Sequence, residues 1–175
     1  MPDLSPRELE LVALAREKCR VLYEGVRTPH RSCGIALAET FGLPTRPYQA
    51  LRRGGVTGAG ECGAIVAGRL VLGELLGDPD PTAPVTPALV DAMAEYEGLW
   101  RERVSRRDAP GSDVVCNTLT GQFVQFRSAE RHGFCTDLAT EVATCVAEVL
   151  ARRGLLGEVA PIEGLTDDAA DGGAR

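Results

Sequence analysis

The sequence lacks several features that mark common classes of protein. It has no run of about eighteen apolar residues that could span a bilayer, and its first ten residues carry acids where a secretory signal would have an apolar stretch. It also lacks the Lys-Ser/Thr pair of a P-loop, a Ser-His-Asp set and a Glu-x-x-His helix motif. These absences argue against a membrane partner and against nucleotide, hydrolase and di-iron sites, and they favour a cytoplasmic protein.

Local cysteine motifs are missing as well, although the chain has six cysteines. No two of them are spaced C-x-x-C, which excludes a locally built zinc ribbon or thioredoxin-type motif, and no C-x-x-C-H is present for covalent haem attachment. Because thiols stay reduced in the cytosol, a framework of disulfides is not expected. A site that uses these cysteines must therefore be assembled by the fold.

Negative charge is concentrated at the C-terminal end. The chain of 175 residues has a formal net charge of −6, and residues 158–175 hold five acids against one base, which leaves −2 on residues 1–157. This balance gives no reason to expect a nucleic acid or an anionic membrane as a partner, and the basic cluster at 101–107 is interpreted as a solvated helix end. We expect one helical domain over 1–157 and a flexible acidic tail over 158–175.

Glycine, proline and capping residues divide the domain into helices. Ser5, Pro6 and Glu8 form an N-terminal capping signature, and Gly25 marks the end of that first helix. Further helices are predicted over 32–42, 61–76, 86–107 and about 135–153, with a short turn at 47–51 and a short helix within 112–126, a segment that would also suit a strand. No βαβ period and no internal repeat is present. The sequence therefore predicts an all-α, compact bundle of about five main helices with a Gly-rich loop before the central helix.

Two of the six cysteines, Cys19 and Cys145, are assigned to packing in the core. Cys135 and Cys145 lie on the apolar stripe of the last predicted helix, and Cys19 lies on the stripe of the first. The Cα atoms of Cys135 and Cys145 are expected about 15 Å apart along the helix axis, beyond the roughly 7 Å limit for a disulfide. Cys19 and Cys145 are interpreted as small buried hydrophobes.

Cys62 follows the glycine-rich stretch 54–60 and lies at about the second position of the helix predicted over 61–76. The helix dipole is expected to lower the pKa of its thiol and to favour the thiolate, which is both the nucleophile and the metal ligand. Cys33, directly after Ser32, has the same setting. Small residues behind Cys62, such as Gly63 and Gly68, are expected to permit close contact between helices.

Four cysteine segments resemble, in order and spacing, a known family. They are SCGIAL around Cys33, GAGECGAIVAG around Cys62, DVVCNTLTG around Cys116 and GFCTDLATEVA around Cys135. Over roughly residues 15–152 the chain resembles the C_GCAxxG_C_C family of small bacterial and archaeal proteins, which is described as redox-active and named for its cysteine pattern. The resemblance implies a helical fold and four functional cysteines, with Cys19 and Cys145 additional to the pattern.

Different functions are open to these four cysteines. In the first, Cys33, Cys62, Cys116 and Cys135 bind an iron–sulfur cluster for electron transfer or redox chemistry, since their number matches the ligand count of a two-iron or four-iron cluster. Zinc on the same thiolates, or no metal, are the alternatives to a cluster. In the second, pairs of thiols cycle between dithiol and disulfide, with Cys62 as the attacking, catalytic thiolate. The third is a non-catalytic binding or assembly module whose cysteines only pack.

The remaining candidates are two histidines. His30 and His132 each lie three residues before one of the four cysteines. They are interpreted as loop histidines without a special role, ahead of proton donors or alternative ligands. The expected partner of the protein is a redox protein or a small molecule, and whether the chain is an enzyme or a homo-oligomer is left open.

Overall fold

The computed structural model describes residues 3–111, 113–162 and 165. Its elements, in chain order, are α1 (Pro6–Glu24), α2 (Cys33–Thr40), the 3-10 helix η1 (Pro47–Leu51), α3 (Gly63–Leu76), α4 (Pro87–Arg103), α5 (Cys116–Thr120) and α6 (Ala129–Ala151). The described residues contain no strand, only an isolated bridge between Glu61 and Val115. The predicted all-α bundle is confirmed.

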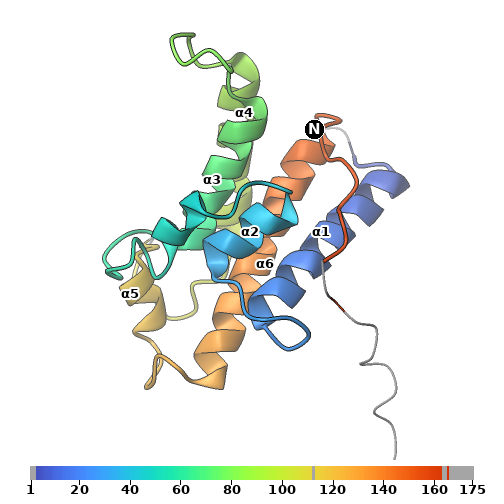
Figure 1. Cartoon of the computed structure of the whole chain (residues 1–175). Helices are drawn as coiled ribbons and strands as arrows, with labels where there is room; N and C mark the ends of the chain where they lie inside the picture. The colour runs from blue at the N-terminus through green and yellow to red at the C-terminus, as the bar shows by residue number, and fades with distance from the viewer. Residues whose placement is uncertain (1–2, 112, 163–164, 166–175) are drawn as a thin grey trace, which may run out of the picture.

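Helix α6 is the centre of the bundle. It contacts α1, α2, α3 and α4, and Figure 1 shows it crossing the middle of the molecule with α1 alongside it. Buried aromatic and aliphatic side chains such as Trp100, Tyr96 and Leu22 fill the space between these helices. The short helix α5 lies at the side where α3 begins (Figure 1), and its Leu119 is part of the main core.

The first helix begins and ends as predicted. The Ser5 hydroxyl accepts a hydrogen bond from the Glu8 N–H, and the Glu8 carboxylate accepts one from the Ser5 N–H. Gly25, with φ of 70°, ends the helix in the left-handed conformation that favours glycine. These local capping bonds explain why the bounds of α1 could be predicted from sequence alone.

The predicted start of the last helix was wrong. Helix α6 begins at Ala129, and not near Cys135, because the Ser128 hydroxyl accepts a hydrogen bond from the Arg131 N–H at 3.1 Å and caps the earlier start. Cys135 is therefore inside the helix. Helix α4 ends at Arg103, whereas the sequence predicted a helix that extends to residue 107.

The predicted tail is described only in part. Val159 packs against the cluster formed by Val12, Ala15 and Ala147, and Ile162 packs against the main core, so the first residues after 157 belong to the folded body. Apart from Leu165, the rest of the predicted tail 158–175 lies outside the described residues. No helix in the described part of the chain has both the length and the apolar character needed to cross a bilayer.

Cys19 and Cys145 are completely buried in the core, as the helical periodicity predicts. The Cys19 thiol faces the carbonyl oxygen of Ala139 on α6 at 3.6 Å. Burial raises the pKa of the Cys19 thiol and of the Cys145 thiol from 9.0 to about 12. Both side chains therefore pack as neutral groups near pH 7.

This pKa difference predicts a loss of stability in alkali. Because the folded-state pKa values are raised, their stabilising contribution is complete below pH 9.0 and is lost as pH rises toward 12. Each thiol contributes a slope of up to about 1.4 kcal/mol per pH unit. Urea unfolding between pH 8 and 10 should show a shallower decline in a Cys19→Ala, Cys145→Ala double variant than in the wild type. Equal slopes would contradict the assignment.

Candidate functional site

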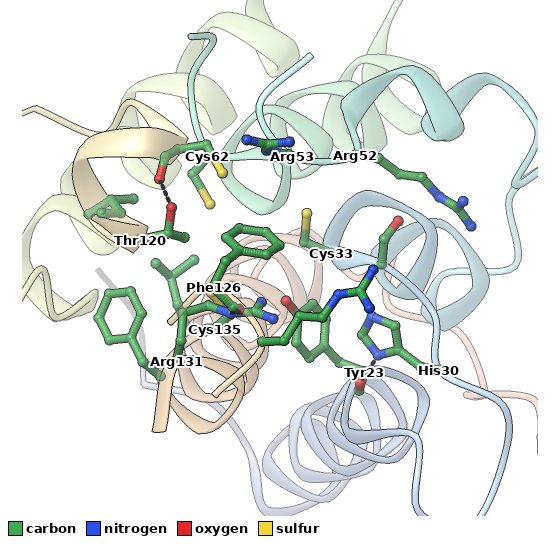
Figure 2. A pocket seen from close by; sticks show the side chains of 17 residues that line it. Tyr23, His30, Cys33, Arg52, Arg53, Cys62, Thr120, Phe126, Arg131 and Cys135 are labelled. Carbon is green, nitrogen blue, oxygen red and sulfur yellow. Dashed lines mark hydrogen bonds between the residues drawn. The ribbon is translucent and has the colours of Figure 1, made fainter. Parts of the chain in front are cut away.

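The four cysteines of the predicted site line one cavity. Its volume is about 520 Å³, and Cys33, Cys62, Cys116 and Cys135 are all on its wall, whereas Cys19 and Cys145 are not. Figure 2 shows this cavity with Cys62 at one side and Cys33 nearer the centre. The four thiols come from α2, from the residue before α3, from α5 and from α6. Segments far apart in the sequence are thus brought to a common space.

The glycine-rich loop positions Cys62 next to the segment that carries Cys116. The Cys62 N–H donates to the Val114 carbonyl at 2.8 Å, and the Cys116 N–H donates to the Gly60 carbonyl at 2.9 Å. Glu61 and Val115 form the bridge between these hydrogen bonds. The two cysteines therefore lie on the same face of a short antiparallel contact.

Gly54 shows why this loop needs glycine. Its φ is 54°, and a Cβ there would lie 2.5 Å from the Gly60 carbonyl oxygen and 2.6 Å from the Cβ of Cys116. Only a residue without a side chain permits this approach at a left-handed φ. The sequence shows that Cys62 follows the glycine run, but it does not reveal that Gly54 packs against the Cys116 segment.

Gly63 has the same role on the other side of Cys62. A Cβ on Gly63 would overlap the carbonyl oxygen of Leu51 and would lie 2.9 Å from the sulfur of Cys33. The start of α3 can therefore lie directly against η1 and against the start of α2. Gly68, one turn further along α3, instead accommodates Tyr96, whose hydroxyl donates to the Ile65 carbonyl at 2.9 Å.

The expected lowering of the cysteine pKa values was wrong. Cys62 is the N-cap of α3 and not its second residue, and its side chain is buried. Burial raises the pKa of Cys62 well above its ordinary range, and the N–H groups of Ala64 and Ile65 offset this only in part. Burial likewise raises the pKa of Cys33 to about 12. Desolvation outweighs the helix dipole here because Cys62 is buried and Cys33 packs, partly buried, against the core.

The other two thiols are also harder to ionise than a free cysteine. Burial raises the pKa of Cys116 and of Cys135, while the nearby Arg131 guanidinium acts in the opposite direction on both. The negative charges of Cys116 and Cys135 in turn raise the pKa of Cys33. The four thiols thus form one electrostatically linked group, in which ionisation of one disfavours ionisation of the next.

His30 lies in a loop as expected, whereas His132 does not. His132 lies within α6, where its Nε2 is 3.0 Å from the Glu24 carbonyl oxygen, and its ring stacks on Tyr23 with centroids 5.6 Å apart. His30 lies between α1 and α2, lines the cavity and donates from Nδ1 to the Tyr23 carbonyl. That bond leaves Nε2 of His30 as an acceptor. Burial lowers the pKa of His30, so this ring is neutral near pH 7.

Several residues of the site were missed in the sequence. The arginine cluster, defined by its position on the cavity wall, consists of Arg52, Arg53, Arg127 and Arg131. Figure 2 shows Arg53 on the same side as Cys62, and Arg52 at the upper right, on the side away from Cys62. A signal was present in the sequence, since Arg52 and Arg53 directly precede the glycine run, and Arg127 and Arg131 are one helical turn apart just before Cys135.

The candidate metal ligands of the cavity are its four thiols. The described residues contain no group of three or more His, Cys, Asp or Glu side chains arranged to hold a single metal ion. An iron–sulfur cluster places iron and sulfide between its cysteine ligands, so its thiolates stand further apart than those around one zinc ion. Four thiols equal the ligand count of such a cluster; Cys62 is buried, and Cys33, Cys116 and Cys135 are partly buried.

Comparisons with known proteins were made over the whole chain. No protein-family model matches it, no curated protein matches it, and no solved structure matches it. The resemblance to the C_GCAxxG_C_C family remains a prediction from the cysteine motifs.

Proposed function

We propose that this chain is a redox protein in which Cys33, Cys62, Cys116 and Cys135 hold an iron–sulfur cluster. The observation that carries the proposal is the sorting of the six cysteines: four line one cavity, and Cys19 and Cys145 are buried elsewhere in the core. Those four are the cysteines of the C_GCAxxG_C_C pattern, so membership of that family is part of the proposal. When bound, a cluster of this kind accepts and donates single electrons.

The state of the thiols supports ligation over nucleophilic attack. Cys62 is only 8% exposed and its thiol is protonated near pH 7, which are poor properties for a residue that attacks a disulfide in another protein. A bound cation removes this obstacle because metal-coordinated thiols are deprotonated outright. Mutual repulsion among four thiolates is also relieved when they share a cationic core.

The protein's own residues would influence such a centre in three ways. Cys62 lies at the start of α3, where the N–H groups of Ala64 and Ile65 lower the pKa of its thiol and so favour the thiolate that binds metal. The arginine cluster supplies positive charge on the same cavity wall, which favours the more negative, reduced state. Phe126 and Phe134 add apolar surface that limits access of water.

Reconstitution tests the proposal. The chain, purified without oxygen, is incubated with ferrous iron and sulfide, desalted, and assayed for visible absorption, iron and acid-labile sulfide. We expect a coloured protein with iron and sulfide in similar amounts. A colourless protein that retains neither element would overturn the proposal.

A second function, a metal-free dithiol/disulfide cycle, is favoured by one observation. Cys62 and Cys116 lie on the same face of the contact made by Glu61 and Val115. Diagonal neighbours across such a contact are about 7–8 Å apart, so a disulfide between them needs a small backbone shift. Mild oxidation of the metal-free chain followed by peptide mapping would detect this bond. Oxidation without a Cys62–Cys116 peptide would rule this pair out.

A further inference from the structure

The cavity is cationic although the chain is acidic. The arginine cluster contributes four guanidinium groups to its wall, and no aspartate or glutamate is among the described residues that line it. The whole chain has a formal net charge of −6, so carboxylates are abundant elsewhere. Four like charges around one cavity repel each other unless an anion lies among them.

Other arginines of this fold show what usually offsets such a charge. Arg69 pairs with Glu61 and Glu97, and Arg152 pairs with Glu95 at 2.5 Å. Across the described residues, the ion pairs involve none of the four guanidinium groups of the arginine cluster. Arg52, Arg53 and Arg127 are exposed to water, so their guanidinium groups are open to an anion in the cavity.

Two of these guanidinium groups are held in place by Phe126. The carbon centre of the Arg131 guanidinium is 4.4 Å from the centroid of the Phe126 ring, and that of Arg53 is 5.3 Å away. Arg131 Nε also donates to the Phe126 carbonyl oxygen at 2.6 Å. The remaining N–H groups of both arginines stay available, in the forked geometry that suits a carboxylate or a phosphate.

The backbone also holds Arg53 in an unusual state. Its φ is 48°, in the left-handed region that residues with a side chain seldom adopt. Such conformations persist where the surrounding structure fixes them, and they gather at ligand sites. Here the conformation occurs at the residue that brings a guanidinium group to the cavity, directly before the glycine loop.

The cavity has room for a molecule beside the sulfur centre. Its volume of about 520 Å³ lies within the range of small-molecule sites, about 300–1,000 Å³. Phe126, Phe134 and Leu119 give part of the wall an apolar character. The hydroxyl of Ser32, another lining residue, is buried and has no hydrogen-bond partner among the described residues.

We infer that this cavity binds a small organic oxyanion, with its carboxylate or phosphate on the arginine cluster and its apolar part against Phe126 and Phe134. The inference adds to the proposed function the chemical class of its substrate. It rests on the proposed function only for the redox role of the site. Binding of the anion itself needs no cluster.

Phenyl phosphate is a suitable probe because it has one oxyanion and one aromatic ring. Its binding is measured by titration calorimetry on the metal-free chain and on the reconstituted chain, with benzyl alcohol as the neutral comparison. The test variant is Arg52→Gln with Arg127→Gln, since neither side chain makes a hydrogen bond or ion pair within the described residues. The matched control is Arg46→Gln, an exposed arginine beside η1 that is not on the cavity wall.

We expect saturable binding of phenyl phosphate that is at least about tenfold weaker in the double variant and changes by less than about twofold in Arg46→Gln. Absence of saturable binding, equal binding of benzyl alcohol, or an equal loss in the control overturns the inference. Iron uptake without anion binding means that the arginines only offset the charge of the cluster, so this inference fails while the proposed function stands. Anion binding without iron uptake means that the proposed function fails while this inference stands.

Discussion

Replacing Cys62 by serine should abolish stable binding of the cluster. The substitution removes one of four thiolate ligands, and a serine hydroxyl is a much poorer ligand for iron near pH 7. After reconstitution we expect iron and sulfide per chain to fall at least about tenfold. Replacing a residue that only hydrogen-bonds to a metal ligand already weakens metal binding about tenfold or more, so loss of the ligand itself should weaken it further. The readouts are visible absorption and the two elemental assays.

Serine is the informative replacement at this position because it preserves the fold. Cys62 is the N-cap of α3, and its side chain makes no capping bond, whereas serine is among the preferred N-cap residues. The metal-free variant should therefore unfold at a urea concentration at least as high as that of the wild type. A loss of iron can then be assigned to the missing sulfur.

Cys145→Ala is the matched control for the cysteine itself. Cys145 is completely buried on α6 but does not line the cavity, so its replacement should cost about 1 kcal/mol of stability through a small void and leave the iron content unchanged. Full iron loading of Cys62→Ser, or an equal loss in Cys145→Ala, would contradict the assignment of ligands.

The parts of the fold that could be predicted are those coded by neighbouring residues. The capping box of Ser5 and Glu8 and the glycine at position 25 define α1, and Thr86 with Pro87 starts α4, where the Thr86 hydroxyl accepts from the Leu89 N–H at 3.1 Å. The start of α6 was missed because the apolar stripe begins only at Cys135, while the cap at Ser128 precedes it. Local polar bonds, and not the apolar pattern, determine that boundary.

The candidate site was predictable in its cysteines but not in its environment. The resemblance to the C_GCAxxG_C_C family singled out four cysteines, and these four line the cavity. Their pKa values could not be predicted because burial depends on α2, α5 and α6 packing around the start of α3, which no local pattern encodes. The arginine cluster was missed for the same reason, since its members come from separate loops and from α6.

Among substitutions in the site that remove no ligand atom, Gly63→Ala should lower the stability of the protein most. A Cβ at residue 63 would overlap the Leu51 carbonyl oxygen and lie 2.9 Å from the sulfur of Cys33. The first of these neighbours is backbone, so relief requires the start of α3 to move away from η1 and to carry Cys62 with it. We expect a loss of about 3 kcal/mol in the free energy of unfolding of the metal-free chain, the upper part of the range for overpacked sites.

Gly73→Ala on the same helix separates this effect from helix propensity. No atom lies within 4 Å of a Cβ built on Gly73, so the change should leave stability unaltered or raise it by up to about 1 kcal/mol. Urea unfolding and iron content after reconstitution are measured on both variants. Wild-type stability together with full iron loading in Gly63→Ala would contradict a need for close approach at this point.

The two glycine variants also test whether geometry alone decides cluster binding. Gly63→Ala changes no sulfur, but it alters the distance between the segments that carry Cys33 and Cys62. Thiolates bind a cluster together only when their sulfurs match its ligand positions, so a folded Gly63→Ala chain should take up less iron than Gly73→Ala. A reduced iron content in a chain with all six cysteines would mean that the glycines next to Cys62 are required for the position of the ligands, in addition to the packing of α3.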